Sequence, residues 1–305
     1  MTPTRIVTRG DVRLAVYEWG SAADGKPTLV LVHGYPDSAR VWDAVAERLA
    51  GQFHVVSYDV RGAGQSSAPS RVRDYRILEL MGDLAAVFDA VAPGRKIHLV
   101  GHDWGSIQSW ESVTLSPMRD RIASYSSISG PSLDHVGYWL REHAKPGWKG
   151  QQLLRQLARS WYIAAFQLPL FAPAAWRFGV GRSWSKLVRA MEGTVVDASP
   201  TQTADGRNGI NLYRANVLPR LLRPEPRHAI APVQLIIPMR DRFVSPELFE
   251  GLSRWVPVLR RRAIDAGHWL LLSHPDKVAS CIGEWAAEHD AGAARPASTA
   301  KAHRA

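Results

Sequence analysis

Short apolar runs alternate with helix-length amphipathic segments along the first 130 or so residues. Two runs, Thr28–Val32 and Lys96–Val100, are apolar nearly throughout, which is typical of parallel strands that are covered by helices on both faces. Further strands are expected at residues 12–19, 54–58 and 122–128, and helices at about 77–91 and from about 105. This alternation predicts an α/β fold with a mostly parallel central sheet flanked by helices.

The pattern changes near residue 135. From there to residue 228 the chain is rich in Trp, Arg and Pro, with helical but no strand periodicity. Alternation then returns, and it predicts a strand at 233–237, a helix at about 246–255, a strand at 262–264 and a helix at about 275–288. We therefore expect one α/β core from residues 1–134 and 229–290, with an α-helical cap at 135–228 inserted after the sixth strand. Residues 291–305 are small, polar and low in complexity, so a flexible tail or linker is expected there.

Positive charge is concentrated in the expected cap. The chain has a formal net charge of +10, and residues 135–227 alone hold 14 Lys and Arg against 5 Asp and Glu. These basic residues are interleaved with tryptophans, which suits an anionic membrane surface or a lipid-like substrate. A solvated basic face explains the same charge. No nucleic-acid recognition module accompanies it, so nucleic-acid binding is not expected.

The sequence predicts a cytoplasmic protein. Its first residues lack the apolar segment of a secretory signal, and no apolar run reaches the roughly 18 residues that a membrane span needs. A peripheral contact with the inner membrane surface, through the basic cap, is a further expectation.

The strongest chemical motif lies at the end of the strand near residue 100. The segment IHLVGHDWGS, residues 97–106, is a buried strand that enters a G-x-D-x-G turn, where glycines leave room for a sharp turn into a helix. Its central residue is Asp103. A carboxylate gains little by attacking an acyl carbon, but its attack on an sp³ carbon that bears a leaving group yields an ordinary ester. Asp103 is thus the candidate nucleophile toward epoxides or alkyl halides, the alternative being a plain helix cap.

A second motif, HGYP at residues 33–36, follows the strand at 28–32. It is expected to form a tight loop beside the Asp103 turn, at the carboxyl edge of the sheet where open α/β sheets bind ligands. The backbone N–H groups of Tyr35 and Trp104 are candidates for holding a developing oxyanion. His33 and Pro36 are expected to line the substrate pocket. The glycine-rich DVRGAGQS segment, residues 59–66, reads as structural support for this region.

An acid and a histidine complete the set of candidate catalytic residues. Asp241 follows the strand at 233–237, and His268 follows the next strand within AGHW, so the order is nucleophile, acid, histidine, as in the α/β-hydrolase fold. His268 is expected to activate water against an ester of Asp103, while Asp241 orients the imidazole and stabilises its protonated form. Asp265, only three residues before His268, is a rival for the acid.

With HGYP, DVRGAGQSS, GHDWGS, a late aspartate and GHW in this order, the chain resembles the epoxide hydrolases of the α/β-hydrolase superfamily across about residues 12–288. The resemblance implies a helical lid with two tyrosines that hold and protonate the epoxide oxygen. SWYIAAFQLP at 160–169 and GINLYRAN at 209–216 match the two lid motifs and assign Tyr162 and Tyr213 to that role. A phenol with a pKa near about 10 is suited to donate to a developing alkoxide. Phe166 and Trp269 join the expected pocket residues.

The resemblance implies hydrolysis of small-molecule or lipid epoxides to vicinal diols through a covalent aspartyl ester, without a metal or an organic cofactor. The lid entrance ISGPSLDH, residues 128–135, is similar to actinobacterial hydrolases fused to a C-terminal short-chain dehydrogenase, which implies bulky lipid-like epoxides and a possible second unit outside this chain. No dinucleotide fingerprint occurs in the sequence itself.

Two other functions stay open. A haloalkane dehalogenase shares the aspartate, the following tryptophan and the histidine–acid pair, but it needs N–H donors around a halide rather than two tyrosines. A hydrolase-fold protein that only binds a partner has the same scaffold without the chemistry, since fold alone does not determine function.

Overall fold

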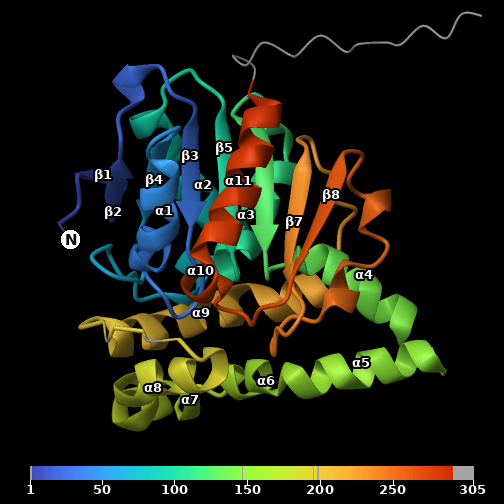
Figure 1. Ribbon diagram of the computed structural model, residues 1–305. Coiled ribbons are helices and arrows are strands. Elements are labelled where there is room, and N and C mark those ends of the chain that lie inside the picture. The colour runs from blue at the N-terminus through green and yellow to red at the C-terminus, as the bar shows by residue number, and fades with distance from the viewer. Residues whose placement is uncertain (1, 146, 195, 198, 291–305) are drawn as a thin grey trace, which may run out of the picture.

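An eight-stranded sheet forms the centre of the protein, with strand order β1-β2-β4-β3-β5-β6-β7-β8 (Figure 1). The computed structural model describes residues 2–145, 147–194, 196–197 and 199–290. Strand β2 pairs antiparallel with β1 and β4, and the other neighbours pair in parallel. The predicted α/β-hydrolase architecture is confirmed. The strands are β1 (Arg5–Arg9), β2 (Val12–Trp19), β3 (Thr28–Val32), β4 (His54–Tyr58), β5 (Ile97–His102), β6 (Ile122–Ile128), β7 (Val233–Pro238) and β8 (Leu259–Ile264).

Helices cover both faces of the sheet. The core helices are α1 (Asp43–Leu49), α2 (Ile77–Val91), α3 (Trp104–Thr114), α10 (Leu270–Ser273) and α11 (Pro275–His289). Between β6 and β7 lie α4 (Leu133–His143), α5 (Trp148–Arg159), α6 (Trp161–Gln167), α7 (Phe171–Ala175), α8 (Gly181–Glu192) and α9 (Gln202–Leu222), with a π-helical turn η5 (Trp176–Val180) before α8. Short 3-10 turns include η2 (Ala39–Trp42) and η3 (Val72–Tyr75).

Strand β3 shows why the central strands are apolar on both sides. Val30 and Val32 pack into the cluster that contains α2 and α3 side chains such as Phe88. Leu29 and Leu31 point the other way, into the cluster formed with α1 and α11. Because side chains alternate along a strand, a strand between two helical layers must be apolar at every position.

The cap helices lie across one end of the sheet. Figure 1 shows α5 to α8 as a layer beneath the carboxyl ends of the strands, with α9 between this layer and the sheet. Helix α9 packs against α4, α6, α7 and α8, so it holds the insertion together. All of α4 to α9 lie between β6, the sixth strand, and β7. The boundaries 134/135 and 228/229 stay predictions, and α4 already begins at Leu133.

Three expectations about local structure were wrong or incomplete. The predicted helix at 246–255 is a pair of 3-10 turns, η6 (Pro246–Phe249) and η7 (Leu252–Arg254), because Gly251 between them adopts a left-handed backbone with φ of 69°. Strand β8 begins at Leu259 rather than at residue 262, since its arginines are tolerated on an edge strand. Strand β1 was not predicted. The predicted tail at 291–305 lies outside the described residues.

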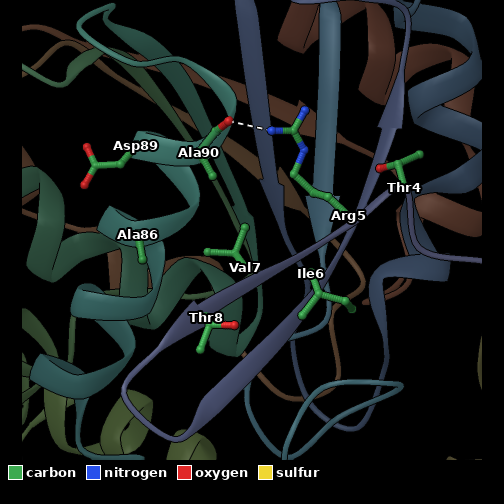
Figure 2. Close-up of a pocket in the computed structure, with 8 residues that line it drawn as sticks. All are labelled: Thr4, Arg5, Ile6, Val7, Thr8, Ala86, Asp89 and Ala90. Atoms are coloured by element: carbon green, nitrogen blue, oxygen red, sulfur yellow. Dashed lines mark hydrogen bonds between the residues drawn. The ribbon is translucent and has the colours of Figure 1, made fainter.

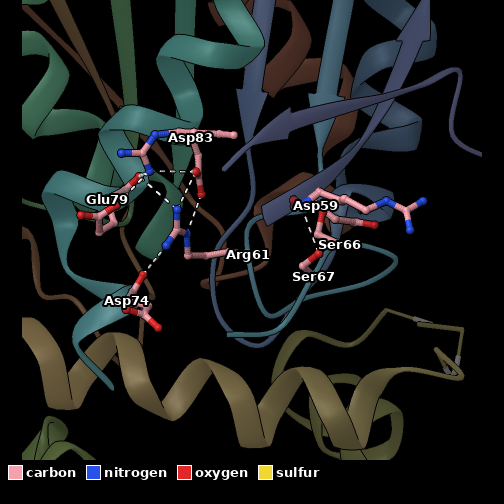
Figure 3. Close-up of polar contacts among 9 residues, drawn as sticks. Asp59, Arg61, Ser66, Ser67, Asp74, Glu79 and Asp83 are labelled. Atoms are coloured by element: carbon pink, nitrogen blue, oxygen red, sulfur yellow. Dashed lines mark hydrogen bonds and ion pairs between the residues drawn. The ribbon is translucent and has the colours of Figure 1, made fainter. Parts of the chain in front are cut away.

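The DVRGAGQS loop is built from buried polar contacts (Figure 3). Asp59 accepts hydrogen bonds from the backbone N–H groups of Ala39 and Gln65, both at 2.8 Å, and from the hydroxyl of Tyr17 at 3.0 Å. The guanidinium of Arg61 is buried and donates twice to Asp83 at 2.6 Å. These contacts hold the loop against the core, in agreement with the prediction that it serves as structural support.

This loop also meets the cap. The N–H of Gly64 donates to Asp205 of α9 at 3.0 Å, and Asn208 of α9 donates to the carbonyl of Gly62, also at 3.0 Å. A fixed loop thus sets the position of α9 over the sheet. None of the helices in the described part of the chain is both long and apolar enough to cross a bilayer.

Replacing Arg61 with alanine is expected to lower the free energy of unfolding by about 3 kcal/mol, because Asp83 then loses its closest cation in a buried setting. Urea denaturation followed by circular dichroism measures the change. Arg71→Ala is the matched control, since Arg71 is an exposed arginine ten residues further along the chain. A difference from the control of less than about 1 kcal/mol would contradict a structural role of this ion pair.

Candidate active site

Asp103 stands at the turn between β5 and α3 with an unusual backbone. Its φ is 50° and its ψ is −122°, which a residue with a side chain rarely adopts and which costs roughly 1–3 kcal/mol. The flanking glycines are required sterically: a Cβ at Gly105 would collide with the carbonyl of Val32, and one at Gly101 would lie 2.6 Å from the Cα of Ser106. The G-x-D-x-G pattern thus reflects close packing of the turn.

The carboxylate of Asp103 faces two backbone amides. Oδ1 accepts a hydrogen bond from the N–H of Tyr35 at 2.7 Å, and the N–H of Trp104 also stabilises the charged carboxylate. Burial raises the pKa of Asp103 to about 6, although the positive charge of His268 and the two amides act in the opposite direction. The two amides that were predicted to hold an oxyanion therefore both lie at the nucleophile.

The HGYP loop brings Tyr35 to this place. A Cβ at Gly34 would collide with the side chain of Asp103, so only glycine lets the loop come this close. His33 lies behind the loop, where its Nε2 accepts the N–H of Val60 at 2.9 Å. His33, predicted to line the substrate pocket, is not among the residues that line the cavity described below; its ring is buried and holds the loop.

His268 and Asp241 form the expected pair. Nδ1 of His268 lies 2.8 Å from Oδ2 of Asp241, and Nε2 lies 3.7 Å from Oδ2 of Asp103. The other oxygen of Asp241 accepts the N–H groups of Phe243 at 2.7 Å and Val244 at 3.0 Å, so its orientation is fixed. The rival, Asp265, is 79% exposed and pairs with Arg240, so it does not contact the histidine.

Buried charges dominate the electrostatics of this pair. Burial opposes protonation of His268, but the carboxylates of Asp241, Asp103 and Asp37 outweigh it and raise the pKa of His268 to about 9. Burial likewise opposes the charge of Asp241, and the imidazolium overcomes it and lowers the pKa of Asp241. Between about pH 6 and 9 the resting site therefore holds an ionised Asp103 beside an imidazolium.

A cavity of about 600 Å³ lies between this site and the cap. Tyr162 of α6 and Tyr213 of α9 line it together with Asp103 and His268. The rings of Tyr162 and Tyr213 pack edge to face, with 6.0 Å between their centroids. Burial raises the pKa of both phenols above the usual value, and nearby negative charge adds to this effect. Both phenols are therefore protonated at neutral pH and able to donate. Of the other predicted pocket residues, Pro36, Phe166 and Trp269 line the cavity.

Several residues at the site had no clear signal in the sequence. Asp37 follows HGYP directly and accepts the indole N–H of Trp269 at 2.9 Å, and burial raises its pKa to about 7. Phe243 packs edge to face on both His268 and Tyr162, with centroid distances of 5.0 and 5.7 Å. Arg159 and Arg242 line the cavity as well. Only Asp37, adjacent to a recognised motif, was within reach of sequence reasoning.

A second groove lies far from this chemistry. Figure 2 shows it between β1 and α2, lined by residues 4–8 and by Ala86, Asp89 and Ala90. Arg5 there donates to the carbonyl of Ala90 at 2.6 Å. In the sheet, β2, β4 and β3 separate β1 from β5, which carries Asp103, so this groove is not part of the site.

Comparison with known proteins agrees with this geometry. Residues 27–275 match the family described as alpha/beta hydrolase fold. "Probable oxidoreductase EphD" of Mycobacterium tuberculosis is 37% identical over 295 residues, which cover 93% of this chain and 49% of EphD. "Bifunctional epoxide hydrolase 2" of Mus musculus is 22% identical over 92% of this chain and 54% of its own length. The chain thus spans about half the length of both.

Solved structures share the fold. An epoxide hydrolase from Bacillus megaterium superimposes with a TM-score of 0.76 and 20% sequence identity, covering 92% of this chain and 99% of the other. At this identity the likeness concerns the arrangement of the core and the cap.

Replacing Asp241 with asparagine is expected to lower the pKa of His268 from about 9, because burial of the ring then meets less opposition from negative charge. The ¹⁵N shifts of the imidazole, followed against pH, measure it. Since the folded-state pKa is raised, the pair stabilises the fold fully below about pH 6.5 and the gain is lost as pH rises through about 9. In Asp241→Asn the free energy of unfolding should lack this decline with rising pH.

Asp265→Asn is the control for that titration, because Asp265 lies only three residues before His268 in the sequence but does not contact the ring. An unchanged pKa of His268 in Asp241→Asn, or an equal fall in Asp265→Asn, would refute the pairing.

Proposed function

Because this chain belongs to the alpha/beta hydrolase fold family, and because an aspartate occupies the nucleophile position, we propose that it is an epoxide hydrolase that converts epoxides to vicinal diols. The observation that carries this proposal is the convergence of one carboxylate and two protonated phenols on the same cavity. The matches to proteins named epoxide hydrolases support it.

The first step forms an ester. Tyr162 and Tyr213 donate hydrogen bonds to the epoxide oxygen, and a carboxylate oxygen of Asp103 attacks a ring carbon. The C–O bond of the epoxide breaks, and the oxygen takes a proton from one of the tyrosines, which becomes a phenolate. Protonation is needed because an alkoxide is a poor leaving group. A hydroxyalkyl ester of Asp103 results.

The second step releases the diol. The imidazolium of His268 first gives its proton to the tyrosinate. The neutral ring then takes a proton from water, and the hydroxide attacks the carbonyl carbon of the Asp103 ester. The N–H groups of Tyr35 and Trp104, which already face this carboxyl, stabilise the oxyanion. The intermediate then expels the alkoxide of the diol, which takes the remaining water proton. The proton that His268 took from water stays on the ring, so the imidazolium of the resting site is restored. The enzyme is restored without a cofactor.

Ester formation also prepares His268 to act as a base. The charge of Asp103 is one of the influences that raise the pKa of His268 in the resting site. Esterification removes that charge, so the pKa falls toward neutrality at the stage where a neutral imidazole is required. Asp241 remains ionised and holds the ring in place.

Haloalkane dehalogenation is the second candidate. The indole N–H of Trp104 is buried at the site, and its ring lies beside that of Tyr213, with 4.9 Å between centroids. Such a donor suits a halide leaving group. The two phenols favour an epoxide oxygen instead, because that oxygen requires a proton.

A dehydrogenase unit fused to the hydrolase is a further proposal, which concerns longer relatives such as EphD. EphD is named a probable oxidoreductase, and this chain matches about half of it. Residues 128–135 resemble hydrolases that are fused to a short-chain dehydrogenase, and a fused dehydrogenase would explain the name oxidoreductase. In such relatives the dehydrogenase would lie in the part that this chain does not match.

Peripheral contact with a membrane through the cap is proposed as well. Large apolar side chains are exposed along α5 to α8, beside exposed basic residues of the same helices. Aromatic and aliphatic side chains with basic neighbours bind anionic lipid surfaces. We name this the cap face, and its exposed apolar members are Trp148, Leu154, Leu157, Trp161, Leu168, Leu170, Phe171, Phe178 and Leu187. Exposed arginines and a lysine of the cap face are Arg155, Arg159, Arg177, Arg182, Lys186 and Arg189.

The catalytic cavity opens beside the cap face. Trp161, Phe171 and Leu187 are 69%, 60% and 42% exposed, and all three also line the cavity. A protein lying with this face on a bilayer would receive an apolar substrate from the lipid without exposing it to water.

Epoxide hydrolysis is tested by diol formation from a panel of epoxides, with halide release measured on matched alkyl halides. Asp103→Asn is expected to abolish both reactions. Tyr162→Phe combined with Tyr213→Phe is expected to reduce diol formation by at least about 100-fold, because the epoxide oxygen then lacks its acid. In His268→Gln, mass spectrometry should show an ester on Asp103.

Halide release that does not depend on the tyrosines would make the protein a dehalogenase. Absence of an adduct on Asp103 in His268→Gln would refute the two-step scheme. Diol formation that survives Asp103→Asn would refute the nucleophile.

Membrane contact is tested by sedimentation with vesicles of pure phosphatidylcholine and with vesicles that also contain phosphatidylglycerol. We expect binding to the anionic vesicles and a several-fold loss in Leu170→Ser combined with Phe178→Ser, which are 81% and 74% exposed. Ile6→Ser, an exposed apolar position on β1, is the control. Equal binding to both vesicle types would count against the electrostatic contribution.

A further inference from the structure

Two arginines stand at the rim of the catalytic cavity without a carboxylate partner. Arg159 ends α5, and Arg242 directly follows Asp241. Both line the cavity and both are exposed. Among the described residues neither forms an ion pair or a hydrogen bond, whereas the neighbouring Arg240 pairs with Asp265 at 3.0 Å and Arg254 with Glu142 at 3.5 Å.

One junction between the cap and the core positions both arginines. The side chain of Gln156, one turn before Arg159, donates to the carbonyl of Phe243 at 2.9 Å and accepts the N–H of Ser245 at 3.2 Å. Gln156 is itself buried. The end of α5 is therefore tied to the loop that carries Arg242, and the two guanidinium groups arise from the same side of the cavity.

The rest of the cavity wall is apolar. Apart from the catalytic groups and the tyrosines, it is lined chiefly by aromatic and aliphatic side chains such as Trp161, Phe171, Val180, Trp184, Leu187 and Met191. Asp103, the one carboxylate that lines the cavity among the described residues, faces His268 and the two amides. The cations at the rim are thus free to bind a group that a ligand brings.

An apolar cavity with cations at its rim fits an amphiphile. Guanidinium groups bind carboxylates and phosphates through paired hydrogen bonds, and a mainly apolar wall gains free energy from burying a hydrocarbon chain. We propose that the substrate is an epoxide within an apolar chain that ends in an anionic group, which Arg159 and Arg242 hold at the cavity mouth. This inference rests on the proposed epoxide hydrolysis and specifies its substrate class.

Kinetics with a matched pair of probes tests the inference, using 9,10-epoxyoctadecanoate and its methyl ester. We expect the wild type to have a lower KM for the acid than for the ester. Arg159→Gln and Arg242→Gln should each raise KM for the acid by about fivefold, with kcat and the ester kinetics nearly unchanged, as expected for a solvent-accessible charged contact. Arg159→Lys should restore part of the loss.

Arg155→Gln is the matched control. Arg155 lies on the same helix and is exposed, but it does not line the cavity, so this variant removes one positive charge from the cap face without removing a rim contact. A rise in KM equal to that of Arg159→Gln would show a general charge effect and overturn the inference. So would equal KM values for acid and ester in the wild type.

Calorimetric titration with ligands that lack an epoxide keeps this test separate from the proposed reaction. Dodecanoate and dodecyl phosphate, each below its critical micelle concentration, are compared with dodecanol below its solubility limit. Binding of either anion that exceeds binding of the alcohol, and that weakens in Arg159→Gln combined with Arg242→Gln but not in Arg155→Gln, supports the rim site even if no epoxide is opened. Preference for carboxylate indicates a free acid, and preference for phosphate a phospholipid-like substrate. Equal binding of all three refutes the site.

Discussion

The ionised carboxylate of Asp103, held in a buried turn, is the interaction on which the rest of the structure depends. A charge in such a place is costly unless it is paired and hydrogen-bonded, and here two amides and an imidazolium stabilise it. Each of these partners requires its own local geometry. The turn needs glycines at 101 and 105, and the loop that supplies the Tyr35 amide needs glycine at 34. The parallel sheet brings these segments together because its strands end at one edge.

The cap completes the site through contacts with the same loops. The hydroxyl of Tyr35 donates to the carbonyl of Gly206 on α9 at 3.0 Å, and Gln202 of α9 donates to the carbonyl of Pro36 at 2.8 Å. Helix α9 is therefore anchored to the HGYP loop as well as to the loop stabilised by Asp59 and Arg61. Tyr213, carried by the same helix, is held over the nucleophile, and its burial keeps the phenol protonated. One helix thus links the fold of the core to the acid that the proposed reaction requires.

The outward side of the cap has a different chemistry from its inner side. Within, aromatic side chains surround the catalytic groups, and outside, exposed apolar residues lie beside basic ones. The cavity mouth, with Trp161 and Phe171 and the arginines of its rim, lies where the two meet. An amphiphilic epoxide and a lipid surface suit the same arrangement, because both present a hydrocarbon region next to negative charge.

The sequence by itself determined the sheet apart from strand β1 and the start of β8, the order of nucleophile, acid and histidine, and the identity of the main catalytic candidates. These follow from local rules: strands covered on both faces are apolar throughout, and a sharp strand-to-helix turn demands glycine around Asp103. Local patterns failed where the backbone depends on a neighbour, as at Gly251, which interrupts an expected helix, and at β8, where edge position tolerates arginines. Only the tertiary structure decided that Asp241 rather than Asp265 meets His268, that His33 supports the loop from behind, and that Arg159 and Arg242 share one rim. These outcomes depend on distances between segments that are far apart in the chain, and such distances arise only when the sheet and the cap pack together.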